Sequence, residues 1–278
     1  MKGLLVRIGV DQAYGRWNAP VDAAGQFVYV PIPEKVGTAF HPGLERCYGE
    51  VLPALHRFCR DHDRDLFSDL RFPPDLLNHP VHLDPDFECL TYGDVGDRRG
   101  AEMASMSEGD MLVFYSGMRP IHHCEHRLIY ALVGLYVVQE VLSVGRVSPE
   151  RWYENAHVRK TKRGKTDIVV IAKPGVSGRF DRCIPIGEWR NRSYRVRQDV
   201  LDAWGGLSVK DGFIQRTSCI NEILPNWRVP GLRLSKEARK APDWYFSHPV
   251  SRSKSEMTFL RQSGNRETCH SSTARPRS

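Results

Sequence analysis

Short apolar runs separated by turn residues dominate this chain, and they predict strands more often than helices. The first run, Leu4 to Val10, has the length and composition of a buried strand. A second run, Phe27 to Val30, is closed by Pro31 and Pro33, residues that end a strand. Runs rich in Val, Ile and aromatic residues predict further strands at 87–94, 109–117, 128–142, 166–172 and 183–186.

Helical periodicity is limited to two regions. Between Pro42 and Asp61, apolar side chains recur at spacings of three and four, and Pro53 interrupts the pattern early. The 198–225 region is also predicted to be helical, with a turn at Gly205 and Gly206. The prolines and aspartates of 67–86 indicate an irregular connection. We therefore expect an α+β protein in which a mixed β-sheet is flanked by helices.

The composition suits one globular domain. The chain has 278 residues, 41% of them hydrophobic, which is enough to bury a core. We expect that domain to span 1–250 and the Ser/Arg-rich segment 251–278, which lacks apolar periodicity, to be a disordered basic tail. We expect no secretory signal, because the first apolar run is short and is broken by Arg7 and Asp11, and the sequence has no apolar stretch of about 20 residues. Its seven cysteines are scattered and never spaced CxxC, which favours reduced thiols in the cytoplasm.

Positive charge is concentrated in one part of the chain. The net charge is +7, yet residues 151–197 alone hold thirteen Lys/Arg against four Asp/Glu, interleaved with aromatic residues. Such a segment attracts a polyanion, and stacking aromatics beside cations suit nucleic acid. The alternative is a solvated basic face without a partner. The expected phosphate contacts are Arg159, Lys160, Lys162, Arg163 and Lys165.

A carboxylate follows the first predicted strand. Asp11 ends the apolar run and opens a loop that contains Tyr14, Arg16, Trp17 and Asn18. An acid at the tip of a rigid strand, facing aromatic and amide side chains, can hold a flat ligand against a charged group. The simpler interpretation is that Asp11 starts a turn and Trp17 fills the core.

Several motifs resemble known families. The Gly109–Asp110 turn, the strand ending in Tyr115 and the run YALVGLYVV are similar to the barrel of PUA-like domains, which include the ASCH and EVE readers of modified bases. Most of residues 3–190 resembles the nucleotide modification associated domain family, third type. The matching pieces are VRIGVDQAYGRWNAP, GQFVYVPIPE, LTYGD, GDMLVFYSG, YALVGLYVV, ENAHVRK and TDIVVIAKPGVSGRFDRCIPIG. The resemblance implies a PUA-like barrel at the core of the sheet.

The resemblance also implies action on modified bases of double-stranded DNA, in bacterial and phage systems that hypermodify DNA or defend against it. One related activity is excision of glucosylated hydroxymethylcytosine by an anti-phage DNA glycosylase. We therefore expect a monofunctional DNA glycosylase that flips a hypermodified cytosine and hydrolyses its N-glycosidic bond, leaving an abasic site. The alternative is a non-catalytic reader that recruits, or belongs to, a modification or restriction system.

The residue types suit base excision. Asp11 is expected to stabilise the positive charge that develops on the deoxyribose. If 155–159 is extended, Asn155, His157 and Arg159 share one face. The trio is then expected to polarise the leaving base, with His157 as proton donor, or to grip a phosphate through Arg159; the alternative is a positioning role on the backbone. The predicted base pocket combines side chains for stacking and side chains for hydrogen bonding to the base or its sugar: Gln12, Tyr14, Arg16, Trp17, Asn18, Tyr29, Tyr92, Asp94 and Tyr115.

Other kinds of chemistry find little support in the sequence. The segment His122-His123-Cys124-Glu125-His126 has metal-ligand residue types, but consecutive side chains cannot all point inward, so no metal site is expected there. The chain contains no Walker loop, no GxGxxG after a strand and no GxSxG elbow. ATP-dependent phosphoryl transfer, dinucleotide redox chemistry and serine hydrolysis are therefore disfavoured. We expect no cofactor, and the oligomeric state is left open.

Overall fold

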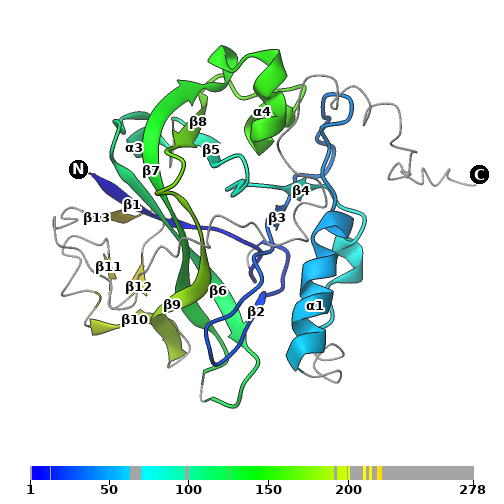
Figure 1. Cartoon of the computed structure of the whole chain (residues 1–278), viewed down its shortest axis with the longest axis vertical. Helices are drawn as coiled ribbons and strands as arrows, with labels where there is room; N and C mark the ends of the chain where they lie inside the picture. The colour runs from blue at the N-terminus through cyan, green and yellow to red at the C-terminus, as the bar shows by residue number, and fades with distance from the viewer. Residues whose placement is uncertain are drawn as a thin grey trace, which may run out of the picture. The chain divides into compact units, whose positions relative to one another are not determined.

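The computed structural model describes residues 2–12, 14–62, 70–97, 100–124, 126–190, 193–198, 200, 209–210, 213–214 and 218–220. These residues form one large mixed sheet with few helices (Figure 1). Along its main path the strand order is β10 (Ser193–Val196), β9 (Gly178–Arg190), β7 (Ile129–Ser143), β6 (Met111–Pro120), β1 (Gly3–Arg7) and β13 (Ser218–Ile220). Three further strands join the sheet off this path: β2 (Pro20–Val21), β5 (Thr91–Val95) and β8 (Asp167–Ala172).

The long strand β7 organises the sheet. One stretch of it, from Ile129 to Val137, pairs antiparallel with β6, and Ile129 to Leu135 also pairs with β9. Beyond that stretch, Val138 to Ser143 pairs with β8, which in turn pairs with β5. Figure 1 shows β8 and β5 at one end of β7 and β9 toward the other. The β5–β8 pair therefore forms a branch, which carries part of the candidate site.

The core lies on both faces of the sheet because side chains alternate along each strand. In β6, Leu112 and Phe114 belong to one hydrophobic cluster, while Met111, Val113 and Tyr115 belong to another. All five side chains are buried, so β6 reads as a continuous apolar run.

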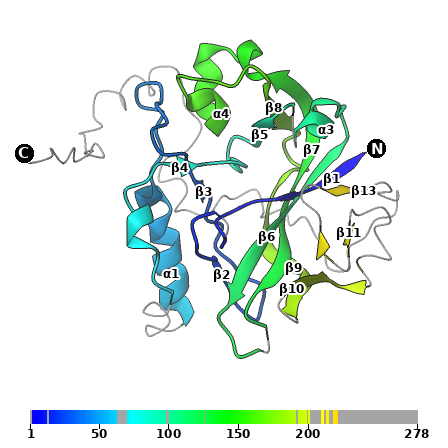
Figure 2. The same cartoon turned by 180° about the vertical axis from the view of Figure 1, so that it is seen from behind.

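Helices are short, except for α1. The helix α1 (Leu52–His62) places Pro53 in its first turn, where a proline is tolerated, and buries Ala54, Leu55 and Cys59. Figure 2 shows α1 beside the β3 and β4 segments, away from β9 and β10. The remaining regular elements are the helices α3 (Ala101–Ala104) and α4 (Ala156–Arg159), the 3-10 helices η1 (Tyr48–Glu50), η2 (Pro74–Leu76), η3 (Val144–Arg146) and η4 (Pro149–Glu154), and two strand pairs, β3 (Ile32–Pro33) with β4 (Val81–His82) and β11 (Val209–Lys210) with β12 (Phe213–Ile214).

The mixed sheet and most of its strands are confirmed. The predicted strands at 4–10, 109–117, 128–142, 166–172 and 183–186 correspond to β1, β6, β7, β8 and β9, with β9 much longer than predicted. Within the described residues, no pairing joins β13 to β10, so the sheet is open and the closed PUA-like barrel is not found. The described part of the chain contains no helix long and apolar enough to cross a membrane.

Three local predictions were wrong. The Phe27–Val30 run is buried, yet it forms only an isolated bridge from Phe27 to Val21. The strand predicted at 87–94 begins at Thr91, because Leu90 has a φ of 54° and the chain turns there. In the region predicted to be helical, 198–225, Gln198 and Val200 are helical, but the described segments 209–210, 213–214 and 218–220 are strands. The predicted tail, 251–278, lies outside the described residues.

Candidate active site

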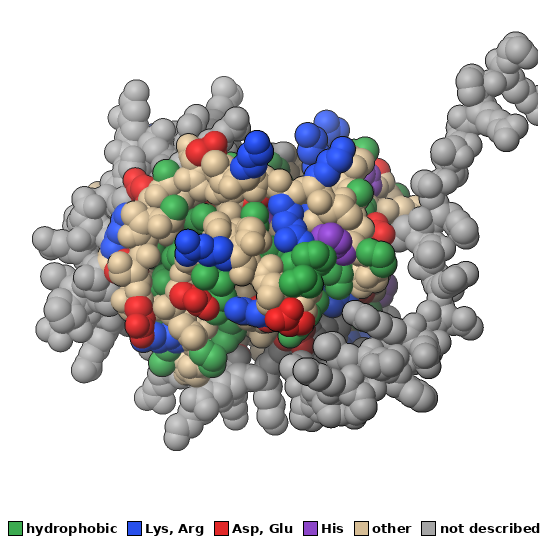
Figure 3. All heavy atoms as spheres, turned by 90° about the horizontal axis from the view of Figure 1, so that it is seen from above, with side chains coloured by type: hydrophobic (Ala, Val, Ile, Leu, Met, Phe, Trp, Pro, Cys, Tyr) green, Lys and Arg blue, Asp and Glu red, His purple; other side chains and the backbone are tan. Residues whose placement is uncertain are grey.

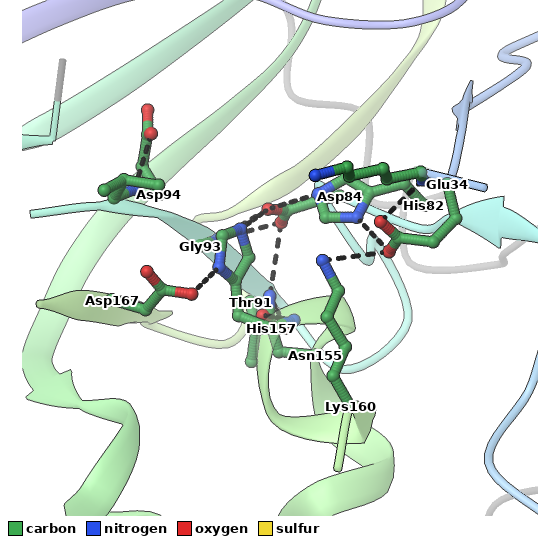
Figure 4. Close-up of polar contacts among 12 residues, drawn as sticks. Glu34, His82, Asp84, Thr91, Gly93, Asp94, Asn155, His157, Lys160 and Asp167 are labelled. Carbon is green, nitrogen blue, oxygen red and sulfur yellow. Dashed lines mark hydrogen bonds and ion pairs between the residues drawn. The ribbon is translucent and has the colours of Figure 1, made fainter. Parts of the chain in front are cut away.

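A buried carboxylate lies where five segments of the chain meet. Asp84 follows β4, and its side chain is only 3% exposed. Its two oxygens accept hydrogen bonds from the backbone N–H of Gly93 at 2.8 and 2.9 Å, and Oδ1 also accepts one from Asn155 Nδ2 at 3.2 Å (Figure 4). Two N–H donors thus hold the buried Asp84 carboxylate in a fixed position.

Two histidines flank this carboxylate with matching geometry. His82 Nδ1 lies 2.8 Å from Glu34, and His157 Nδ1 lies 2.8 Å from Asp167. The opposite nitrogens, Nε2, lie 3.7 Å (His82) and 3.6 Å (His157) from the same oxygen, Asp84 Oδ2. Each ring is therefore oriented by an outer carboxylate toward one central carboxylate (Figure 4). We call this arrangement the Asp84 centre: Glu34, His82, Asp84, Asn155, His157 and Asp167.

Local structure explains how Asn155 and His157 reach the centre. Asn155 is the N-cap of α4, and its side-chain oxygen accepts the backbone N–H of His157 at 2.8 Å. Its Nδ2 donates to Asp84 and to Thr91 Oγ1, the latter at 3.3 Å. The cap thus ties the start of α4 to β5. The segment is a helix rather than the predicted extended chain, so Asn155, His157 and Arg159 do not share one face by a period of two.

Gly93 leaves the room that this packing needs. A Cβ at this position would lie 2.5 Å from His157 Cδ2 and 2.8 Å from Asn155 Oδ1. Both distances are too short for any side chain. Glycine is therefore required because β5 passes directly against the start of α4.

The outer carboxylates are ionised at neutral pH. Burial raises the pKa of Glu34, but the hydrogen bond and charge of His82, together with Lys160 at 3.0 Å, outweigh it and hold that pKa at about 2. The hydrogen bond from His157 likewise lowers the pKa of Asp167, despite burial. Burial lowers the pKa of His82, but Asp84 and Glu34 raise it overall. The centre thus concentrates negative charge around two imidazoles.

Arg159, at the end of α4, is buried and forms an ion pair. Its Nη2 lies 2.6 Å from Asp86 Oδ2, and its Nε donates to the backbone oxygen of Tyr153 at 2.9 Å. The arginine side chain is 3% exposed and that of Asp86 is 1% exposed. The predicted phosphate contact by Arg159 was therefore wrong, because the guanidinium is buried in an ion pair.

Asp11 belongs to a different set of contacts. It lies after β1 as predicted, but its side chain is 2% exposed, forms an ion pair with Arg7 at 2.8 Å and accepts the backbone N–H of Tyr14 at 3.0 Å. Arg7 also donates to Tyr130 Oη at 3.2 Å. Asn155 and His157 are brought together at Asp84, whereas the contacts of Asp11 lead to Arg7 and to its own loop. The carboxylate of Asp11 is thus a turn-forming, charge-neutralised group.

Most of the aromatic side chains predicted to stack on a base are core residues. Trp17, Tyr29, Tyr92 and Tyr115 are each at most 8% exposed. Trp17 packs edge-on against Phe72, with ring centroids 5.3 Å apart. The predicted stacking role of these four side chains is therefore not supported in this conformation, because their faces are covered by protein.

The polar members of the predicted pocket differ in exposure. Gln12, Tyr14 and Arg16 are exposed on the loop after β1. Asn18 is buried, accepts a hydrogen bond from Gln12 at 2.9 Å and donates one to the backbone oxygen of Gly117 at 2.9 Å. Asp94 is half-buried, and its carboxylate accepts the N–H of Val95. The loop after β1 therefore offers three exposed side chains to a ligand.

The basic turn 160–166 lies directly between two members of the Asp84 centre, since His157 precedes it and Asp167 follows it. Lys162 and Lys165 are exposed on this turn. Two other cations are anchored to the protein: Lys160 to Glu34 at 3.0 Å, and Arg163 over the ring of Trp152 at 3.9 Å. Figure 3, which views the molecule from the end where α4 lies, shows lysine and arginine side chains interspersed with acidic ones.

The sequence prediction missed four members of the centre: Glu34, His82, Asp84 and Asp167. One signal for them was present, because in the stretch HLDPDFECLTYGD the residues His82 and Asp84 share a face in an extended chain. The part of this stretch that holds His82 and Asp84 was interpreted only as a connection. Glu34 and Asp167 carry no comparable local signal.

The fold and the site define a mixed-sheet α+β protein with a buried centre of carboxylates and histidines beside a basic turn. The chain matches the model of the family described as nucleotide modification associated domain 3 over residues 2–213. This protein therefore belongs to that family, and the matched region contains the whole Asp84 centre as well as Asp11. Comparison with curated proteins and with solved structures gives no significant match.

Proposed function

We propose that this protein is a DNA glycosylase that excises a hypermodified cytosine from phage DNA and that the Asp84 centre carries the reaction. The supporting observation is the buried Asp84 carboxylate flanked by two histidines, each oriented by its own outer carboxylate. The family is associated with nucleotide modification, which supports a modified base as the substrate. Asp84 thus takes the catalytic role that the sequence analysis gave to Asp11.

The proposed reaction is a hydrolysis. Breaking the N-glycosidic bond leaves its electron pair on the base and positive charge on the deoxyribose, which a fixed carboxylate stabilises. Water supplies a hydroxyl group to C1′ and a proton to the departing base. Asp84, His82 and His157 hold and activate that water. Lys160 is paired with Glu34, which fits water rather than a lysine amine as the nucleophile.

The basic turn explains how DNA reaches the centre. Lys162 and Lys165 are exposed between His157 and Asp167, so phosphate contacts on this turn place the DNA backbone next to the centre. The base must then leave the stack, at a cost of a few kcal/mol that contacts in the protein offset.

The loop after β1 is proposed to recognise the modification. Gln12, Tyr14 and Arg16 are exposed there and supply hydrogen-bonding groups and one aromatic face for a sugar carried by the base. Asp11, paired with Arg7, positions this loop rather than contacting the deoxyribose.

The test uses two DNA substrates and one catalytic variant. Purified protein is incubated with glucosylated and with unglucosylated phage DNA, and the released base is identified by mass spectrometry while abasic sites are scored as alkali-labile breaks. We expect release from the modified DNA only, and none from Asp84→Asn. The matched control is Asp22→Asn, which changes a carboxylate bound to a histidine elsewhere. Salt-sensitive binding to modified DNA without any base release would instead identify a non-catalytic reader.

A further inference from the structure

The contacts inside the Asp84 centre place electron-rich atoms close together, which is electrostatically unfavourable. His82 and His157 each direct Nδ1 at an outer carboxylate, so in the neutral ring the proton lies on Nδ1. The lone pair on each Nε2 then faces Asp84 Oδ2, which is itself negatively charged. The separations of 3.7 and 3.6 Å exceed the range of about 2.7–3.2 Å for an N–H···O hydrogen bond. With both rings neutral, three electron-rich atoms therefore point at one small region.

We propose that this region binds a divalent first-row transition metal ion, ligated by His82 Nε2, His157 Nε2 and Asp84 Oδ2. The three side chains offer ligand atoms that all lie within 4.8 Å of one another. Metal–ligand bonds of about 2.0–2.2 Å place neighbouring ligand atoms about 3.0–3.6 Å apart. The two Nε2–Oδ2 distances, 3.7 and 3.6 Å, lie just above and at the upper limit of that range, so small side-chain movements are enough to close the site.

The outer residues are those that a metal site needs. A metal-bound histidine commonly donates its other ring N–H to a carboxylate, which fixes the tautomer and the ring orientation. Glu34 and Asp167 do this for His82 and His157, in both cases at 2.8 Å. Asn155 and the N–H of Gly93 fix the carboxylate ligand in turn. Each of the three ligands is thus held by a second residue.

The local charge also fits a divalent cation. With both histidines neutral, Glu34, Asp84 and Asp167 are opposed within the centre by the ammonium group of Lys160 alone. Two negative charges are left without compensation, and a divalent ion supplies the two positive charges that balance them. Protonation of both histidines would also supply two positive charges, so the test must distinguish a bound metal ion from two bound protons.

Two imidazoles and one carboxylate leave coordination positions open, as in catalytic zinc sites. A metal ion in such a site lowers the pKa of a bound water and provides hydroxide near neutral pH. In the proposed hydrolysis, the three side chains would then activate water through the ion rather than directly, and the hydroxide would form the bond to C1′ as the bond to the base breaks. Metal binding does not rest on the proposed function, because it is measured without DNA.

Zn²⁺ binding to the full-length, chelator-treated protein tests the proposal by calorimetry. We expect one tight site in the wild type and its loss in His82→Ala, His157→Ala and Asp84→Asn. Glu34→Gln and Asp167→Asn should weaken binding by about 10- to 100-fold. His62→Ala is the matched control, because His62 forms a similar pair with Asp22 at 2.9 Å and should leave binding unchanged. Equal binding by the wild type and Asp84→Asn, or no saturable binding, would overturn the proposal.

Two further readouts keep the test decisive if a ligand variant does not fold. Co²⁺ in the site should give visible absorption bands in the wild type that Glu34→Gln shifts, whereas His62→Ala should leave them unchanged. Zn²⁺ should also raise the melting temperature of the wild type, because a ligand that binds only the folded state stabilises it. Full base release by the metal-free protein would overturn the catalytic role of the ion and leave the glycosylase proposal standing. Metal binding without base release would overturn the glycosylase proposal and leave the metal site standing.

Discussion

His157 and Asp167 lie ten residues apart and are joined by a 2.8 Å contact between Nδ1 and Oδ2. This contact closes the basic turn, so the exposed lysines of the turn are fixed relative to the Asp84 centre. An exposed basic turn is thereby joined to the buried candidate site. The relationship explains why the exposed lysines and two members of the Asp84 centre, His157 and Asp167, occur within the same short stretch of sequence.

The exposed lysines of the turn should contribute to DNA affinity but not to chemistry. We predict that Lys162→Ala with Lys165→Ala weakens binding and reduces the slope of log K against log salt by about 2, one for each lost phosphate contact. Fluorescence anisotropy at several salt concentrations measures this slope. Arg60→Ala, an exposed cation on α1, should leave the slope unchanged, and an unchanged slope in the double variant would remove the turn from the DNA interface.

Gly93→Ala should disrupt the centre by steric overlap. The added Cβ would lie 2.5 Å from a carbon of His157, and we predict a loss of about 1–3 kcal/mol in the free energy of unfolding. Urea denaturation measures it. Gly145→Ala provides the comparison, because a Cβ there meets nothing within 4 Å. Similar costs for both variants would contradict the close packing of β5 against α4.

Arg159 should matter for stability rather than for DNA binding. Its removal leaves Asp86 buried without its cation, so Arg159→Ala is predicted to cost about 3–5 kcal/mol in the free energy of unfolding. Arg151→Ala breaks a half-exposed ion pair with Glu154 and should cost about 1 kcal/mol or less. Equal, small costs would show that the buried pair contributes little.

The His62–Asp22 pair predicts a pH-dependent contribution to stability. Burial lowers the pKa of His62, but the hydrogen bond to Asp22 and the backbone oxygen of Phe58 raise it above the usual 6.5. A raised pKa in the folded state means that the stabilisation is complete below 6.5 and is lost as pH rises through the folded value. His62→Gln should therefore cost about 1 kcal/mol or less at low pH and almost nothing well above neutrality. If the stability lost in His62→Gln instead grew as pH rises, the raised pKa of His62 would be contradicted.

The sequence was informative wherever the determining pattern was local. The strand β7 follows from its apolar residues, and Asn155 and His157 were identified as a pair within a few residues of each other. The Asp84 centre was beyond such reasoning, because Asp84 and Asn155 are 71 residues apart and only the fold brings them together. Arg159 was misjudged for the same reason: a run of cations does not reveal that one of them pairs with the distant Asp86.

The role of Asp11 shows a further limit. A carboxylate after a buried strand was correctly placed, but the cation that neutralises it, Arg7, lies on the strand itself and its orientation could not be inferred from the apolar run. Burial of Tyr29, Tyr92 and Tyr115 was equally invisible, since an aromatic side chain suits a core and a stacking platform alike, whereas core packing of Trp17 was the alternative that the sequence analysis left open.

The central claim is that Asp84 carries base excision. The most direct measurement compares the initial rate of base release from glucosylated phage DNA for wild type, Asp84→Asn and Asp11→Asn, each shown to be folded by circular dichroism. We predict that Asp84→Asn lowers the rate by at least about 100-fold. Asp11→Asn, which alters the loop after β1 and its pairing with Arg7, should retain much of it. Full activity in Asp84→Asn, with loss confined to Asp11→Asn, would contradict the account and return the catalytic role to the carboxylate after β1.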